Sequence, residues 1–410
     1  MIDDSGPIPP LRPLEYIPYQ QQDSVMIAIR DPMKLSPIII ISPSAHAILR
    51  LIDGKRTVLD IQAEFMRRHG ELLYSHLIRD LINRLNEYHL FANEDFREFY
   101  IALKAEFAGA GVHESVLAGE SYPDDPEQLA TMLVELTGIP AAANGGSSGA
   151  TASGLRGLVV PHIDFQRGGA VYGKGYELLL QVPRPDTIVI LGIDHLGSPG
   201  PVILSRKSFQ TPLGLVTADQ SLLGLLTEAC GNQLYTDEFA HRSEHSVEFQ
   251  VLMLQHIFGQ AVPQIVPVLV SNLRSKSDPG GDPLIQSFTG CLRNAMHRMG
   301  DKLLIIASVD LSHVGTQFGG PALDKHELHG IGEYDAGILR QVVALDSRKL
   351  AELIHEDPRP HNVCGYPALF VLTLLMEGMR GETVQYRQWF DEPGGSCVTF
   401  AAVGFFDRAS

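Results

Sequence analysis

The chain has 410 residues, enough for two or three domains, and 44% of them are hydrophobic, as in globular proteins. Its 48 acidic side chains outnumber its 32 basic ones, and the resulting net charge of −16 argues against nucleic acid or an anionic membrane surface as a partner. The four cysteines are widely spaced and form no CxxC motif, so we expect free thiols and no disulfide framework.

The N-terminal stretch MIDDSGPIPPLRP has acidic residues and prolines where a secretory signal peptide has a basic and then an apolar region. The apolar runs, such as 303–307, are far shorter than the ~20 residues that a membrane span requires. These features predict a cytoplasmic protein without membrane segments.

Residues 12–100 have the pattern of a small winged-helix-like α+β domain. Two β-prone runs, 25–29 and 38–42, flank Asp-Pro and Ser-Pro turn signals and predict a hairpin. Three helices follow: the first ends at Gly54, Thr57 caps the second, and the third shows apolar residues at i, i+3 and i+4 spacing.

The stretch from 42 to 91, with DGKRTV between its first two helices, resembles the PqqD-like domain family. That resemblance implies a domain that binds a peptide or docks a partner protein. A purely structural appendage is the alternative reading. The winged-helix shape alone would suggest DNA binding, which the negative charge of the chain opposes.

A linker over 101–115, rich in small residues, precedes the second predicted domain, residues 116–408. There Asp124 or Asp125, followed by Pro126, predicts the start of a helix that runs to about residue 136. The run of Gly, Ser and Ala over 140–154 predicts a long surface loop inside this domain.

The rest of the chain alternates between strands and helices. We predict strands over 158–161, 187–191, 215–216, 265–270, 303–307, 383–389 and 397–404, and helices over 168–182, 219–230, 246–258, 283–299, 324–344, 347–355 and 367–378. This order predicts an α/β sheet covered by helices on both faces.

Three of these strands end in an acidic residue and a histidine. The segments are LVVPHID, TIVILGIDHLG and LLIIASVDLSHVG, which deliver His162 with Asp164, Asp194 with His195, and Asp310 with His313. One such pair alone is explained by a satisfied loop residue or a helix cap. Because ligands collect at the carboxyl ends of strands in open α/β sheets, three similar ends favour one shared site.

Cys364 stands just before Pro367, which opens an apolar helix. A thiol near a helix N-terminus favours the thiolate, the form that binds metal or attacks a substrate. The alternative is a small buried hydrophobic residue, which is how free cysteines usually behave.

Two further sets of charged residues precede helices. Glu244 and His245 lie in AHRSEHSVEFQ, and they fit a functional role and an exposed helix start equally well. Arg167, followed by Gly168 and Gly169, is a candidate anion clamp at a helix start, or else a surface arginine beside a tight turn.

From about residue 112 to 408 the chain closely resembles the Memo family. The motifs that carry the resemblance are VLAGESYP, VVPHIDFQRGGAVYGKGY, VILGIDHLG, TPLG, AHRSEHSVEFQ, IVPVLV, ASVDLSHVG and VCGYP, in that order. The resemblance implies a fold like that of class III extradiol dioxygenases, with a metal pocket at the strand ends. Matched motif by motif, the metal ligands fall on His162, His195 and Cys364, and Asp310 and His313 line the pocket.

This sequence departs from the animal Memo pattern at two positions: Ile163 replaces a usually small residue and Asp194 replaces a common serine. The added carboxylate of Asp194 could bind metal, hold the imidazole of His195 or act as a base. Asp310 or Asp164 could receive an imidazole N–H, as residues behind a metal ligand do. His313 is the candidate general acid or base, because its ordinary pKa is ~6.5.

Two histidines and one thiolate leave coordination positions open, as catalytic metal sites do. Iron is favoured, with copper or zinc as alternatives. The leading hypothesis is a metal-dependent redox enzyme acting on a small molecule or peptide, with Asp310, His313 and Asp194 in catalysis and a substrate-binding set of Asp164, Arg167, Glu244 and His245.

Two other hypotheses stay open. The first is a non-catalytic peptide- or partner-binding module that retains the dioxygenase-like fold, and the second is a zinc hydrolase with metal-activated water. The resemblance to the Memo family also implies a role in an AmmeMemoRadiSam system, with radical-SAM and AMMECR-type proteins as possible partners.

Overall fold

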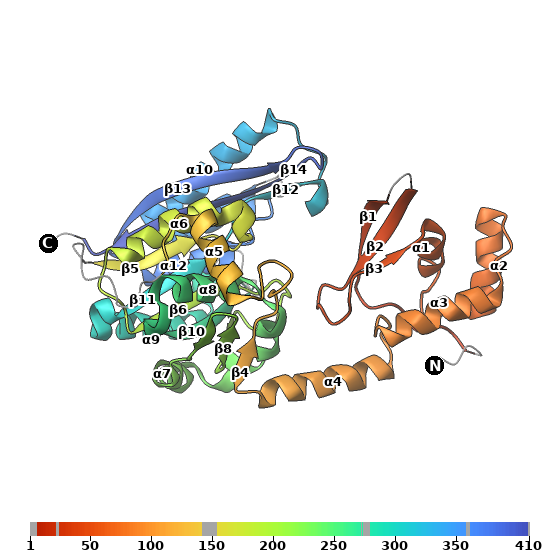
Figure 1. The fold of residues 1–410 in the computed structure, drawn as a ribbon, viewed down its shortest axis with the longest axis horizontal. Helices are drawn as coiled ribbons and strands as arrows, with labels where there is room; N and C mark the ends of the chain where they lie inside the picture. Colours follow the sequence, from red (N-terminus) through yellow and green to blue (C-terminus); the bar gives the residue numbers. More distant parts are fainter. Residues whose placement is uncertain are drawn as a thin grey trace. The chain divides into compact units, whose positions relative to one another are not determined.

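The structure, a computed structural model, describes residues 6–21, 24–141, 154–271, 273, 279–357 and 361–408. It divides into two compact units, Met1–Gly109 and Ala110–Ser410, which are described separately (Figure 1). Most of the predicted loop over 140–154 lies outside the described residues.

Among its described residues, the N-terminal unit combines a three-stranded antiparallel sheet with four helices. The elements are β1 (Glu15–Gln21), β2 (Ser24–Arg30), β3 (Ile39–Ile41), α1 (Pro43–Leu49), α2 (Val58–His69), α3 (Ser75–Glu87) and α4 (Glu94–Gly109). The predicted hairpin is confirmed as β2 paired with β3. The prediction missed β1, which also pairs with β2, because Pro18 and the polar residues after it interrupt the apolar pattern.

Local sequence signals fix the helix ends of this unit. Thr57 caps α2 in a reciprocal capping box with Asp60, and Gly70 ends the helix in a left-handed conformation at φ 72°. α4 continues through the first nine residues of the range predicted as a linker, and none of its residues is buried.

A buried ion pair holds the sheet of the N-terminal unit to its helices. Arg12 and Asp31 are 5% and 3% exposed, and the guanidinium contacts the carboxylate at 2.8 and 3.2 Å. Arg12 also donates to the carbonyl of His89 at 2.7 Å and lies over the ring of Phe96.

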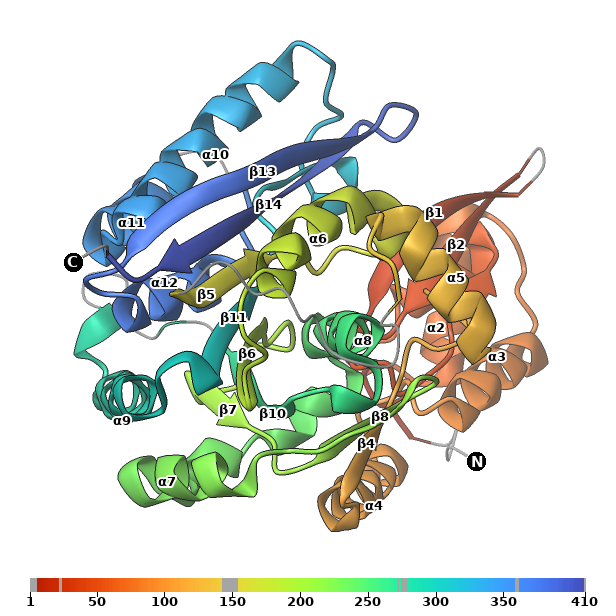
Figure 2. The same ribbon diagram turned by 60° about the vertical axis from the view of Figure 1, so that its left-hand side comes forward.

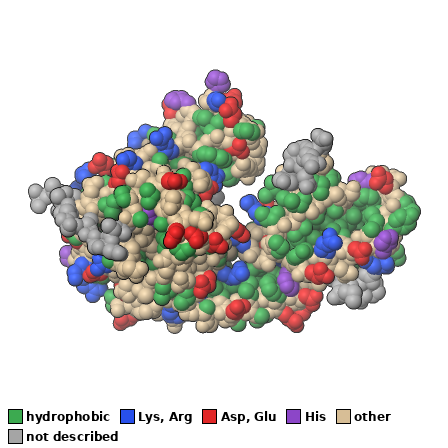
Figure 3. Space-filling model, in the orientation of Figure 1, with side chains coloured by type: hydrophobic (Ala, Val, Ile, Leu, Met, Phe, Trp, Pro, Cys, Tyr) green, Lys and Arg blue, Asp and Glu red, His purple; other side chains and the backbone are tan. Residues whose placement is uncertain are grey.

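The surface of the N-terminal unit is unusually apolar. Twelve of the sixteen large hydrophobic side chains exposed among the described residues belong to it, including Ile38 at 66% and Leu59 at 65% exposure. Figure 3 shows hydrophobic side chains gathered over this unit.

The C-terminal unit contains a mixed sheet of eight strands. Its path runs β12 (His313–Gly315), β14 (Ser396–Phe406), β5 (Leu155–Val160), β11 (Leu303–Ser308), β6 (Thr187–Ile193), β10 (Gln264–Val270) and β7 (Val202–Leu204), with β13 (Arg380–Asp391) paired to β14. The four central strands β5, β11, β6 and β10 are parallel, and the flanking strands are antiparallel. A second, small sheet joins β4 (Val112–Glu114), β8 (Ser208–Thr211) and β9 (Gly214–Val216).

Helices cover both faces of the large sheet, as predicted (Figure 2). Alternate residues of β6 point to opposite faces: Ile188 and Ile190 pack with α5 (Pro126–Thr137), α6 (Phe165–Leu180) and α8 (Ser246–Phe258). Val189 and Leu191 pack with the helices of the other face, α7 (Gln220–Cys230), α9 (Pro283–Met299), α10 (Glu327–Ala344), α11 (Ser347–Glu356) and α12 (Tyr366–Leu375). The fold is therefore a mixed α/β sheet between two helical layers.

The helix predicted over 168–182 begins three residues earlier, at Phe165, because Asp164 caps it by accepting from the Arg167 N–H. Gly168 and Gly169 are thus inside the helix and do not form a turn. The glycines permit close packing, since a Cβ at Gly173 would lie 2.0 Å from the Thr137 carbonyl oxygen of α5.

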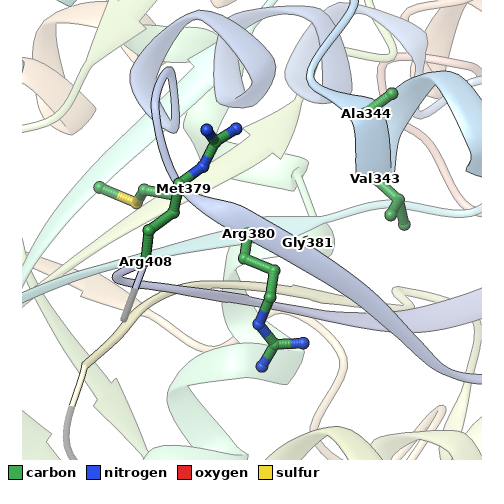
Figure 4. A pocket seen from close by; sticks show the side chains of 6 residues that line it. All are labelled: Val343, Ala344, Met379, Arg380, Gly381 and Arg408. Carbon is green, nitrogen blue, oxygen red and sulfur yellow. The ribbon is translucent and has the colours of Figure 1, made fainter. Parts of the chain in front are cut away.

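A surface hollow between the end of α10 and the start of β13 is lined by Val343, Ala344, Met379, Arg380, Gly381 and Arg408 (Figure 4). None of the candidate site residues lines it. In the part of the chain that the structure describes, no helix has the length and apolar character to cross a membrane.

Candidate metal centre

The predicted site residues come together at the carboxyl ends of the parallel strands. His162 follows β5, Asp194 and His195 follow β6, and Asp310 follows β11. Because these three strands are neighbours in the sheet, residues that are almost 150 positions apart in the chain meet at one edge.

Three histidine side chains form the centre of this edge. The ligand atoms of His162, His195 and His245 all lie within 4.8 Å of one another, close enough to hold a metal ion. The ring of His162 stands almost perpendicular to the other two, with centroids 5.3 Å away, and the rings of His195 and His245 stack at 5.0 Å.

Hydrogen bonds orient each ring so that Nε2 remains for a ligand. His162 Nδ1 lies 2.9 Å from the carbonyl oxygen of Ser308, which can only accept, so Nδ1 carries the proton. His195 and His245 each direct Nδ1 to the carboxylate of Glu244, at 2.9 and 3.2 Å. Fixing the Nδ1 proton in this way is how proteins prepare an imidazole to bind metal.

Cys364 supplies a sulfur to the same cluster. It stands two residues before α12, and its Sγ lies 3.4 Å from His162 Nε2. Burial alone would raise the pKa of this thiol, but the positive charges of His162 and His313 hold the pKa well below its ordinary value, and hydrogen bonds with His162 and His195 add to that effect. This direction favours the thiolate form, which binds metal.

The pKa values of two of the imidazoles, His162 and His195, shift in the complementary direction, whereas burial lowers the pKa of His245. Burial lowers the pKa of His162, yet the charges of Asp310 and Cys364 prevail and raise it to about 9. Burial likewise opposes the charge of His195, but Glu244 and Cys364 raise its pKa to about 11. Despite its burial, Glu244 has a pKa well below the ordinary value because His195 and His245 surround it. The protons on these rings occupy positions that a cation would take.

The two strand-end carboxylates accept hydrogen bonds from backbone N–H groups, and that of Asp310 also faces the site. Asp310 Oδ1 accepts from the backbone N–H groups of His162 and Ile163 at 3.0 and 3.2 Å, and its Oδ2 lies 3.6 Å from His162 Nε2. Asp194 accepts from the N–H groups of Leu196 and Ser198 and so shapes the loop that carries His195.

The structure corrects the predicted partners of the imidazole N–H groups. We expected Asp310 or Asp164 to receive an imidazole N–H, and holding the ring of His195 was one of three roles open to Asp194. Instead, the Ser308 carbonyl receives the His162 proton and Glu244 holds His195. The sequence could not predict these partners. A backbone carbonyl such as that of Ser308 does not depend on residue type, and Glu244 is 49 positions away from His195 in the chain.

His313 and Arg167 stand beside the cluster. His313 Nδ1 donates to the Leu311 carbonyl at 3.1 Å, and its ring packs edge-on against Phe318. Arg167 is not an open anion clamp: it pairs with Asp164 at 2.5 Å and its guanidinium lies over the ring of Trp389.

The family model described as Memo-like protein matches residues 113–403. The chain belongs to the Memo-like family. A MEMO1 family protein of Aquifex aeolicus is 28% identical over 381 residues, covering 92% of this chain and 95% of that protein. One from Thermus thermophilus is 26% identical and covers 85% of this chain and 97% of its own length. An uncharacterized protein from Escherichia coli K12, solved as a crystal structure, aligns with 61% of this chain and 99% of its own at 15% identity and a TM-score of 0.36.

Behind the imidazoles of this Memo-like protein lies a buried network centred on Gln250 of α8. Its amide donates to the carbonyl of Pro161 at 2.8 Å and to Ser308 Oγ at 2.6 Å, and it accepts from the hydroxyl of Tyr176 at 2.9 Å. Gln250 therefore fixes the residue before His162 and also the residue whose carbonyl sets the tautomer of His162.

In this Memo-like protein the prediction assigned His245 to substrate binding and missed its place among the three imidazoles. Only the adjacent acid in SEHS hinted at it, because a carboxylate beside a histidine often orients the ring. Gln250 had no signal in the sequence, since a polar residue in an amphipathic helix is ordinarily read as surface.

Proposed function

We propose that the strand-end cluster binds a transition metal through His162, His195 and Cys364. The observation that carries the proposal is the position of the Cys364 sulfur, 3.4 Å from a histidine nitrogen whose partner nitrogen is already engaged. Two imidazoles and one thiolate match the preferences of iron(II), copper(I) and zinc, and iron is the metal we favour.

The donor set fits such an ion on its own chemistry. The Nδ1 atoms of His162 and His195 are each engaged by an oxygen, His162 Nε2 lies 3.4 Å from the sulfur, and the neighbouring imidazoles lower the pKa of that thiol. Three protein ligands would leave positions open for other molecules, the mark of a catalytic centre.

We further propose a metal-dependent redox enzyme with the architecture of class III extradiol dioxygenases. The support is the family together with a mixed sheet whose parallel strands end at the donor set. A bound metal would supply redox and Lewis-acid chemistry. His313 would move a proton at Nε2, since its Nδ1 is held by a carbonyl, and Asp310 would keep His162 in place.

The substrate in this proposal is a small molecule or a peptide side chain. Asp164 and Arg167 lie at the start of α6, next to Ile163 and the metal ligand His162. In this proposal they would contact the part of the substrate that lies away from the metal. Asp194 would act through the loop that carries His195, because backbone N–H groups engage both of its oxygens.

The exposed apolar side chains of the N-terminal unit favour a second candidate function, that of a partner-binding module. In this proposal the N-terminal unit docks a partner, with radical-SAM and AMMECR-type proteins of an AmmeMemoRadiSam system as the candidates. It is compatible with a metal centre in the other unit.

The test is metal analysis of the full chain purified without oxygen and without chelators. We expect one equivalent of metal, lost in both His162→Ala and His195→Ala, with X-ray absorption that shows sulfur in the coordination shell. The exposed His329→Ala variant is the control and should keep its metal. A protein that binds no iron, copper or zinc under these conditions would contradict the proposal. A catalytic role is then tested by oxygen uptake of the iron-loaded protein with candidate substrates.

A further inference from the structure

The cluster contains two overlapping sets of three donors. Both include His162 and His195. Cys364 completes the first set, the thiolate triad, and His245 completes the second, the imidazole triad. The metal site proposed above uses only the thiolate triad, which leaves His245 without an assigned role.

His245 is held in place as firmly as the other two imidazoles. Glu244 is 5% exposed, and its Oε1 accepts from the backbone N–H groups of His245 and Ser246, each at 2.9 Å. The same oxygen lies 3.2 Å from His245 Nδ1, so carboxylate and ring are positioned together at the start of α8. One carboxylate thus orients the Nε2 atoms of both His195 and His245.

The spacing suits a single ion. Nitrogen ligands lie about 2.0–2.1 Å from zinc, so two of them on one ion are at most about 4.2 Å apart. The three histidine donors already lie within 4.8 Å of one another, and small side-chain rotations would bring them onto one cation. A substrate-binding histidine would not need this convergence.

The two triads differ in chemical preference. A thiolate extends the range of a site to soft ions such as copper(I) alongside iron(II) and zinc, whereas three imidazoles favour borderline divalent ions such as zinc, cobalt or iron. Because both triads share His162 and His195, exchanging the thiolate for the third imidazole removes the affinity for soft ions and does not empty the site.

We infer that His245 is an alternative metal ligand, and that the imidazole triad holds a borderline divalent cation when the thiolate of Cys364 is removed. This inference rests on the proposed metal site. It assigns that site a second mode of binding, in which loss of the Cys364 thiolate restricts the site to borderline divalent ions.

Cobalt(II) is the probe, because its visible spectrum reports ligand type and its binding can be titrated without any assay of activity. The full-length chain is compared with Cys364→Ala, His245→Ala and the double variant. We expect the unsubstituted chain and His245→Ala to show a sulfur-to-cobalt absorption band. Cys364→Ala should lose that band and still bind one equivalent of cobalt. The double variant should lose binding.

If Cys364→Ala binds cobalt no better than the double variant, the inference is wrong while the proposed metal site stands. If the unsubstituted chain binds no metal, the proposed metal site itself fails. Thermal unfolding of each apo variant shows whether the chain remains folded, and Cys364→Ser and His245→Gln repeat the comparison with closer replacements. A His329→Ala control should leave both the band and the stoichiometry unchanged.

Discussion

The two units of this protein place their apolar and charged side chains in opposite ways. The C-terminal unit exposes four of the sixteen large hydrophobic side chains that are exposed among the described residues, and it gathers imidazoles, carboxylates and a thiolate at one sheet edge. The N-terminal unit exposes twelve. This contrast supports the two proposals, a metal centre in the C-terminal unit and a partner-binding surface on the N-terminal unit.

Small size explains part of this difference, because a small domain buries a smaller fraction of its surface. The arrangement of the residues argues for more than size. Ile17 lies opposite Ala28 in the N-terminal sheet, and Ala28 lies opposite Ile40, so these three side chains are cross-strand neighbours on one face. A contiguous apolar row of this kind is typical of an interaction surface.

The largest effect is expected from Asp31→Ala in the N-terminal unit. Removing one partner of a buried ion pair leaves the charge of Arg12 buried without a counter-ion, which should destabilise that unit by about 3–5 kcal/mol. Hydrogen exchange of the full chain should show lost protection in α2 and α3 and unchanged protection in β5 and β6. Glu15→Ala, which breaks an exposed pair with Arg30, should change little.

The same pair predicts how the unit responds to acid. Burial would raise the pKa of Asp31, but Arg12 and the N–H groups of Met33 and Leu35 hold it below its ordinary value of 3.8. Ionised Asp31 therefore stabilises the unit above that pH, and the contribution is lost as the pH falls through the lowered pKa.

In the hydrogen-exchange experiment on the Asp31→Ala variant, an equal loss of protection in both units would show that they do not unfold independently.

The next effect concerns metal affinity. Glu244→Gln keeps the shape of the side chain but removes the charge that holds two imidazoles, so the affinity for metal should fall about 10- to 100-fold. Competition with a chromophoric chelator measures the change. Glu228→Gln, an exposed position on α7, is the control. An unchanged affinity would mean that the carboxylate only caps α8.

Gln250→Leu should have a smaller effect on affinity together with a loss of stability. The variant leaves the buried Pro161 carbonyl without its donor, which costs about 1–3 kcal/mol, and loosens the carbonyl that orients His162. Gln255→Leu on the same helix removes bonds to Thr211 and Gly214 and should cost similar stability without altering metal affinity. Equal effects of the two variants on affinity would rule out a positioning role for Gln250.

The smallest effect is expected on the apolar face of the N-terminal unit. Ile40→Thr keeps a β-branched side chain on an exposed strand, so the free energy of unfolding should change by no more than about 0.5 kcal/mol. Ile29→Thr, at a buried position of β2, should be clearly destabilising. A marked loss of stability in Ile40→Thr would show that its side chain serves the fold and not recognition.

Much of the fold follows from local rules that the sequence displays. Thr57 and Asp125 mark helix starts by hydrogen bonds with residues two or three positions away, and the alternation in β6 separates the two faces of the sheet. The site could be located because parallel strands deliver their ends to one edge, so the meeting of His162 with His195 required only the strand assignments.

The roles within the site depended on contacts that local rules do not contain. Asp194 satisfies its own loop, and Ser308 acts through a backbone carbonyl. Glu244 and Gln250 act across the sheet edge on residues 49 and 89 positions away. Such pairings are set by tertiary packing, and no periodicity in the sequence records them.

The helix that carries His245 has a further consequence. All residues of α8 from Ser246 to Ile257 are buried, so the helix cannot shift without opening voids in a close-packed interior. The N-terminal end of α8, next to His245, is therefore rigid. The conformational entropy cost of arranging the donors is incurred when the chain folds and not when an ion binds. We therefore expect metal binding and release at the proposed centre to leave the backbone conformation unchanged.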